Sequence, residues 1–131
     1  MAAETILIDT SVLIDFFRKR EKSKSVLVQL SNQYRFCISA ITAFEVKIGI
    51  QTQVQQMDYE VLVQNIEILP IDDLCIDAAV AIYKSLKPQN ALIELADLLI
   101  GATAISNSLS LATLNRKHFE RISNLALINL P

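Results

Sequence analysis

The sequence predicts an α/β protein, a three-layer α/β/α sandwich with a central, mostly parallel sheet of four to five strands. Short apolar runs alternate with amphipathic segments along the chain, which is typical of parallel strands joined by helices. The first run, residues 5–9, ends in an acid followed by small hydroxyl residues, as a buried strand does at a sheet edge. No linker or repeat interrupts the 131 residues, so we expect one domain over residues 1–131.

The first half of the chain contains strands followed by short helices. Ser39 has the position of an N-cap, because a small hydroxyl residue precedes an apolar helical run. The expected elements are a strand over residues 5–9, helices over 12–18 and 26–30, a strand over 36–38, a helix after Ser39, a helix over 55–65, and a strand over 66–69 that Pro70 closes.

The second half continues the alternation. Asp72 or Asp73 is expected to cap a helix that ends near Pro88, because aspartate is a preferred N-cap residue. The remaining expected elements are a helix over 94–107, a strand over 109–113, a short helix over 116–122 and a final strand over 126–128.

Composition narrows the function classes. A formal net charge of −2 argues against a protein that coats nucleic acid through bulk charge, although an acidic metal site is itself negative. Two glycines are too few for a P-loop or a Rossmann fingerprint, and one histidine cannot build a His-rich zinc site. No apolar run reaches the roughly 18 residues that a membrane span needs. Isolated Cys37 and Cys75 predict reduced core thiols in a cytoplasmic protein.

Three acids are candidates for catalysis. Asp9 follows the first strand, at the sheet edge where ligands bind in open α/β folds, although it could equally cap the next helix. Glu45 and Asp97 are expected near the starts of apolar helices. A solvated surface position is the alternative for Glu45, whereas an acid amid the apolar residues around Asp97 needs another explanation. Carboxylates gathered at one sheet edge predict a divalent metal and phosphate chemistry.

Hydroxyl and amide side chains accompany these acids. Thr42 lies three residues before Glu45 and shares its helix face. Thr113 and Asn115 follow a strand and could orient water or phosphate, although Asn115 could also cap the next helix. A surface or packing position is favoured for His118. The supporting residues are therefore Thr10, Ser11, Thr42, Thr113 and Asn115.

Two further charged features are assigned no catalytic part. Asp15 is expected too far round the first helix to join the acids, with an indirect role as the alternative. The basic stretch over residues 18–24 is interpreted as a solvated helix end and loop, with contact to RNA phosphates at the rim as the alternative.

The chain resembles PIN-domain nucleases, and more narrowly the VapC-type toxins of type II toxin–antitoxin pairs. Four blocks in order carry the resemblance: Ile8-Asp9-Thr10-Ser11-Val12-Leu13-Ile14-Asp15, Ser39-Ala40-Ile41-Thr42-Ala43-Phe44-Glu45-Val46, Asp97-Leu98-Leu99-Ile100-Gly101-Ala102-Thr103-Ala104, and Leu111-Ala112-Thr113-Leu114-Asn115-Arg116-Lys117-His118-Phe119. The resemblance implies that Asp9, Glu45 and Asp97 are the core acids. The family often has a fourth acid in the last block, where this sequence has Asn115 and His118.

By this resemblance we expect a metal-dependent endoribonuclease toxin with a PIN-like fold, an RNA substrate, a cognate antitoxin partner and a homodimeric state. The metal would be Mg²⁺, or alternatively Mn²⁺, with Asp9 and Asp97 as principal ligands and Glu45 completing the site by holding metal-bound water. One alternative is a phosphatase of haloacid-dehalogenase type, but Ser11 occupies the place of its second aspartate. Others are a phosphoacceptor signalling domain, which needs a mid-chain strand ending in aspartate, and a catalytically weak PIN fold that acts as a protein-interaction module.

Overall fold

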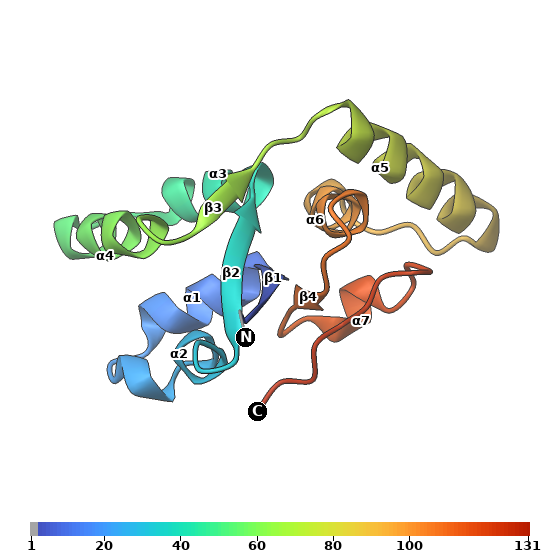
Figure 1. Cartoon of the computed structure of the whole chain (residues 1–131). Coiled ribbons are helices and arrows are strands. Elements are labelled where there is room, and N and C mark those ends of the chain that lie inside the picture. Colours follow the sequence, from blue (N-terminus) through green and yellow to red (C-terminus); the bar gives the residue numbers. More distant parts are fainter. Residues whose placement is uncertain (1–2) are drawn as a thin grey trace.

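The structure, a computed structural model, describes residues 3–131 as a parallel sheet between two layers of helices (Figure 1). The elements are β1 (Glu4–Ile8), α1 (Thr10–Arg18), a 3₁₀ turn (Lys22–Lys24), α2 (Val26–Leu30), β2 (Tyr34–Ser39), α3 (Ala40–Gly49), α4 (Gln53–Val63), β3 (Glu67–Leu69), α5 (Asp73–Leu86), a second 3₁₀ turn (Lys87–Gln89), α6 (Leu95–Ser106), β4 (Leu111–Ala112) and α7 (Arg116–Phe119). The predicted α/β sandwich is confirmed.

The four strands lie in the order β3-β2-β1-β4, and all neighbouring pairs are parallel. The chain therefore runs outward from β1 through β2 to β3, then returns to place β4 on the other side of β1. This reversal makes the carboxyl ends of β1 and β4 a topological switch point, where open α/β sheets bind ligands. Asp9 directly follows β1, and its backbone N–H donates to the carbonyl of Ala112 at the end of β4 (2.9 Å).

Alternate residues of each strand enter opposite cores, because side chains alternate between the faces of a sheet. One core contains Leu7, Cys37, Leu69 and Leu111 with residues of α5, α6 and α7. The other contains Ile6, Ile8, Ile38 and Ala112 with residues of α1, α2, α3 and α4. Figure 1 shows these two helix groups on opposite sides of the sheet. The predicted burial of the sheet on both faces is thus confirmed.

Polar side chains cap the helices that follow the strands. The Ser39 hydroxyl accepts from the N–H of Thr42, and the Asp72 carboxylate accepts from the N–H of Cys75. The predicted Ser39 cap is confirmed, and Asp72 rather than Asp73 is the cap of α5. Each bond satisfies one of the backbone donors that a helix start leaves free.

Several expected boundaries were wrong. β1 ends at Ile8, because Asp9 already serves as the N-cap of α1, which begins at Thr10 rather than Val12. Glu45 is the sixth residue of α3 and not near its start. Residues 126–128 form no strand, and Leu127 makes a single parallel bridge to Leu111. The neighbouring strand β4 has only two residues, which is too short for a longer pairing. The last helix ends at Phe119.

The two cysteines are free and buried, as predicted. Burial, together with the nearby Glu67 carboxylate, raises the pKa of the Cys37 thiol to about 11, so this thiol stays protonated at neutral pH. In the described part of the chain, every helix is too short or too polar to cross a membrane.

Candidate active site

Asp9 is held by hydroxyl groups from two distant parts of the chain. It is 2% exposed, and its Oδ2 accepts from Ser11 Oγ at 2.6 Å and from Thr113 Oγ1 at 2.8 Å. Thr113 in turn accepts from the N–H of Asn115 (2.9 Å), and Ser11 Oγ accepts from the N–H of Leu114 (3.0 Å). This network ties the segment after β4 to the first turn of α1 and fixes the carboxylate at the switch point.

Glu45 reaches the same turn from α3. Thr10 Oγ1 donates to Glu45 Oε1 at 2.7 Å and lies 3.0 Å from Thr42 Oγ1. Thr42 is fully buried and is also 3.2 Å from the Ser39 hydroxyl. Because Thr42 and Glu45 share a helix face, as predicted, one threonine of α1 contacts both. Glu45 is half-buried, so the expectation of a solvated surface glutamate does not hold.

Asp97 is the third residue of α6 and pairs with His118 of α7. His118 Nδ1 lies 2.9 Å from Asp97 Oδ2, and the Asp97 side chain is 18% exposed. Burial raises the pKa of Asp97, the negative charge of Asp9 raises it further, the hydrogen bond and charge of His118 partly offset this, and Glu45 adds to the rise. Asp9 and Glu45 are therefore close enough to Asp97 for their charges to oppose its ionisation.

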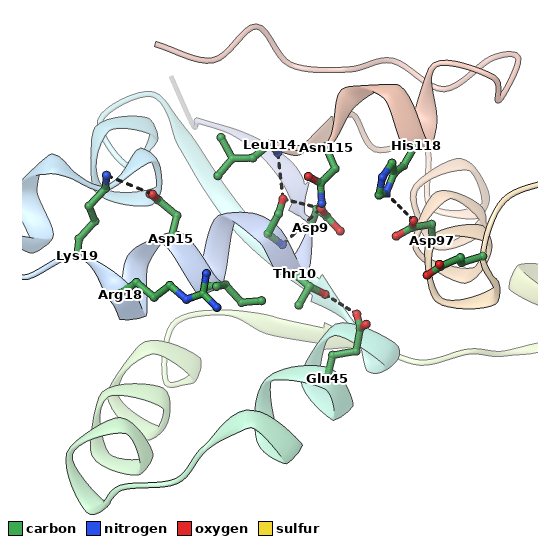
Figure 2. Close-up of a pocket in the computed structure, with 13 residues that line it drawn as sticks. Asp9, Thr10, Asp15, Arg18, Lys19, Glu45, Asp97, Leu114, Asn115 and His118 are labelled. Carbon is green, nitrogen blue, oxygen red and sulfur yellow. Dashed lines mark hydrogen bonds and ion pairs between the residues drawn. The ribbon is translucent and has the colours of Figure 1, made fainter.

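All three acids line one open pocket of about 680 Å³ (Figure 2). Thr10, Ser11 and Asn115 also line it. Asn115 occupies the N-cap position of α7, but within residues 3–131 its side chain forms no capping bond and can face a ligand. Thr42 and Thr113 are buried and outside the pocket lining, so they act through their bonds to the residues that form the wall.

Each acid commits one oxygen to a protein partner, namely Asp9 Oδ2, Glu45 Oε1 and Asp97 Oδ2. Within residues 3–131, their second oxygens accept no hydrogen bond from another side chain or backbone group. Hard carboxylate oxygens of this kind suit Mg²⁺ or Mn²⁺, and a cation would relieve their repulsion. In the conformation shown, no three His, Cys, Asp or Glu side chains of the described residues are grouped closely enough to hold a metal ion. The donor set therefore fits, but these side chains must approach one another to bind.

A family model for the PIN domain matches residues 6–125 of the chain. The chain belongs to the PIN-domain family. Ribonuclease VapC1 of Methanocaldococcus jannaschii is 41% identical to this PIN domain over 122 residues, which cover 93% of the chain and 84% of that protein. Ribonuclease VapC1 of Rickettsia felis is 30% identical over 132 residues, with 95% and 96% covered.

Solved structures agree with this assignment. The structure of VapBC-1 from nontypeable Haemophilus influenzae aligns with a TM-score of 0.82 at 25% identity, covering 95% of this PIN domain and 97% of that chain. A toxin–antitoxin complex from Klebsiella pneumoniae aligns with a TM-score of 0.73 at 30% identity, covering 92% and 95%. The resemblance to VapC-type PIN domains seen in the sequence is confirmed, and the phosphatase and phosphoacceptor alternatives fall away.

Sequence reasoning placed two pocket residues outside the site. Asp15 lines the pocket, where its carboxylate accepts from the N–H of Val26 (2.9 Å) and pairs with Lys19 (3.6 Å). Its spacing of four from Ser11 puts both on one face of α1, and this signal would have found it. His118 is exposed, in agreement with the favoured surface position, and it also contacts Asp97. No local pattern indicates this contact, because the two residues come from different helices.

Arg18, Lys19 and Glu94 also line the pocket. Arg18 and Lys19 follow Ser11 at seven and eight residues, which places them on the same side of α1 two turns later. Both residues are exposed, as expected for a solvated helix end, and they also form part of the pocket wall.

Proposed function

We propose that this PIN domain is a metal-dependent endoribonuclease that acts as the toxin of a toxin–antitoxin pair. The observation that carries the proposal is the convergence of Asp9, Glu45 and Asp97, from three different elements, on one open pocket at the switch point of the sheet. The curated relatives named VapC1 are ribonucleases, which supports RNA as the substrate class.

The metal we propose is Mg²⁺, with Mn²⁺ as the alternative. Asp9 and Asp97 would be the principal ligands, and Glu45 would complete the site by holding metal-bound water through the oxygen that Thr10 does not bind. When bound, such a cation lowers the pKa of water and offsets the negative charge that develops during phosphodiester hydrolysis. Its charge would also stabilise the ionised form of Asp97, which the neighbouring acids oppose.

The protein groups supply position and hydrogen bonds. Ser11 and Thr113 hold Asp9 in one orientation, so that its free oxygen keeps a fixed place in the pocket. Thr10 does the same for Glu45, whose other oxygen can accept a hydrogen bond from the attacking water. The free amide of Asn115 can donate to a phosphate oxygen.

The proposal includes a cognate antitoxin, a homodimer and a cytoplasmic location. An antitoxin is supported by the Haemophilus and Klebsiella neighbours, whose structures are a VapBC protein and a toxin–antitoxin complex. The homodimer and the cytoplasmic location follow from the family resemblance, and an RNA-cleaving toxin would meet its substrate in the cytoplasm.

The direct test is to incubate the purified protein with total RNA, with Mg²⁺, with Mn²⁺ and with EDTA. We expect cleavage that needs the metal and that Asp9→Asn and Asp97→Asn each abolish. Asp77→Asn is the matched control, because Asp77 is exposed on α5 and outside the pocket. Activity in EDTA, or in the Asp9→Asn variant, would contradict the proposal. An inactive wild-type protein that still binds an antitoxin would favour the interaction-module alternative.

A further inference from the structure

The active-site pocket continues into a smaller hollow at each end. One hollow, of about 320 Å³, lies between α1 and α3 and shares Ile14, Arg18 and Glu45 with the pocket. The other, of about 210 Å³, lies beside α7 and shares Glu94, Asp97 and His118 with it. Because each hollow shares lining residues with the pocket, each adjoins it, and together we call the three the active-site groove. The catalytic acids occupy its middle.

Two cations without partners lie on opposite sides of the acids. Arg18 is in the wall between the pocket and the first hollow, and Lys117 lines the second hollow. Both are exposed, and neither forms an ion pair or side-chain hydrogen bond with residues 3–131. Figure 2 shows Arg18 on the side of Asp9 away from Asp97.

The other basic residues of the groove are already engaged. Lys19 pairs with Asp15, and Arg121 donates to the carbonyls of Ala91 and Leu92 at 3.4 Å. Among the basic residues that line the groove, Arg18 and Lys117 are therefore the two that no group of residues 3–131 engages. A cation on each side of the acids is suited to bind a chain of phosphates that runs along the groove, with the reacting phosphate next to the acids.

Apolar side chains are exposed in each part of the groove. Ile14 (38% exposed) lines both the pocket and the first hollow, Leu114 (45%) lines the pocket, and Leu92 (45%) lines the second hollow. A single strand exposes base faces as well as phosphates, so it can contact these side chains and the cations together. A duplex stacks its base faces against one another, so it presents phosphates, 2′-hydroxyls and base edges but no base faces to these apolar side chains. The groove thus favours a single strand.

We propose that one single-stranded segment of RNA lies along the active-site groove, with Arg18 binding a phosphate on one side of the acids and Lys117 binding a phosphate on the other. This inference rests on the proposed ribonuclease function and adds the path of the substrate. Arg18 and Lys117 are positioning residues, because they hold the strand and leave the reacting phosphate to the acids.

The test measures binding of a single-stranded RNA oligonucleotide by fluorescence anisotropy over a range of salt concentrations, in an Asp9→Asn background that keeps the RNA intact. Arg18→Gln and Lys117→Gln should each weaken binding by about two- to fivefold. Each should also reduce the slope of log K against log salt by about 0.7, the value for one phosphate contact on a single strand. A duplex of the same sequence should compete weakly.

Matched controls separate a defined contact from bulk charge. Arg20→Gln and Lys84→Gln each remove one exposed cation that lines neither the pocket nor either hollow. Neither variant should therefore change the slope of log K against log salt. In the active protein, Arg18→Gln and Lys117→Gln should raise KM and leave kcat nearly unchanged, because they remove binding that is uniform through the reaction. Circular dichroism confirms that each variant is folded.

The outcomes distinguish this inference from the proposed function. If the wild-type protein cleaves RNA but the groove variants have the same salt slope as the controls, the strand path is wrong and the ribonuclease proposal stands. A kcat loss without a KM change would also overturn a positioning role. If the wild-type protein neither cleaves nor binds RNA, both proposals fail.

Discussion

Thr113→Val is the most informative single change to the site, because it removes hydrogen bonds and keeps volume. Thr113 is 1% exposed, donates to Asp9 Oδ2 at 2.8 Å and accepts from the N–H of Asn115 at 2.9 Å. A hydrogen bond to a charged group contributes about 1.5–3 kcal/mol, and leaving a partly buried N–H without an acceptor costs about 1 kcal/mol more. Ser11 still binds Asp9, which limits the loss. We expect Thr113→Val to lower the free energy of unfolding by about 2–4 kcal/mol.

Thr113→Ser is the matched control. It keeps the hydroxyl and both bonds but removes one buried methyl group, which costs about 1 kcal/mol. In a chain of this size, 1 kcal/mol corresponds to roughly 3–5 °C in Tm. Thermal unfolding in EDTA should therefore place the valine variant roughly 10 °C below wild type and the serine variant roughly 4 °C below. A valine variant as stable as the serine variant would refute the view that Thr113 holds Asp9 by hydrogen bonding.

Three further predictions follow from named contacts. The raised pKa of Asp97 means that the folded protein keeps this proton where the unfolded chain has released it, so the contribution of Asp97 to the free energy of unfolding falls as pH rises above about 3.8. In EDTA, Asp97→Asn should therefore gain stability relative to wild type over that interval and then level off, and parallel pH–stability curves would contradict this. Gly49→Ala meets nothing and should stabilise by about 0.5–1 kcal/mol in urea titrations. Gly101→Ala should stabilise less or destabilise, because its Cβ would lie 2.7 Å from Ile122 Cδ1 and the buried Ile122 side chain must shift; equal effects would count against this packing. Mg²⁺ at about 100 times its Kd should raise the free energy of unfolding of the wild type by about 2.7 kcal/mol and that of Asp97→Asn by less. A wild-type Tm that does not change with Mg²⁺ concentration would exclude a specific site.

The fold could be predicted because each strand carries a strong local signal. The runs at Ile6-Leu7-Ile8 and Cys37-Ile38 are apolar on both faces, and both faces are buried. Ser39 and Asp72 gave correct cap positions because capping is a local interaction. The 126–128 segment was mistaken for a strand because an apolar run does not show whether a neighbour is long enough to pair with it.

The sequence singled out the acids of the candidate site more readily than the residues that form hydrogen bonds with them. Asp9 and Asp97 stand out because an acid inside an apolar segment is costly unless something satisfies it. The Thr10 bond to Glu45 and the His118 bond to Asp97 join residues 35 and 21 positions apart, so only the folded chain brings them together. Asp15 and Arg18 were recoverable from helix periodicity, because both share the face of Ser11.

The hydrogen bonds divide the site into two halves. The first turn of α1 is the centre of one half, where Asp9, Thr10 and Ser11 contact the segment after β4 and the side chains of α3. Asp97 and His118 form the other half, and within residues 3–131 no side-chain hydrogen bond joins this pair to the first half.

Across this division the interaction between the halves is repulsive, since the charges of Asp9 and Glu45 raise the pKa of Asp97. A cation is the group that turns this repulsion into attraction, because it can bind the free oxygens of both halves. Among the described residues no three His, Cys, Asp or Glu side chains are grouped closely enough to hold a metal ion, so the metal that we propose would need the two halves to approach each other. Metal affinity should then depend as much on the contacts that hold each half rigid as on the acids themselves.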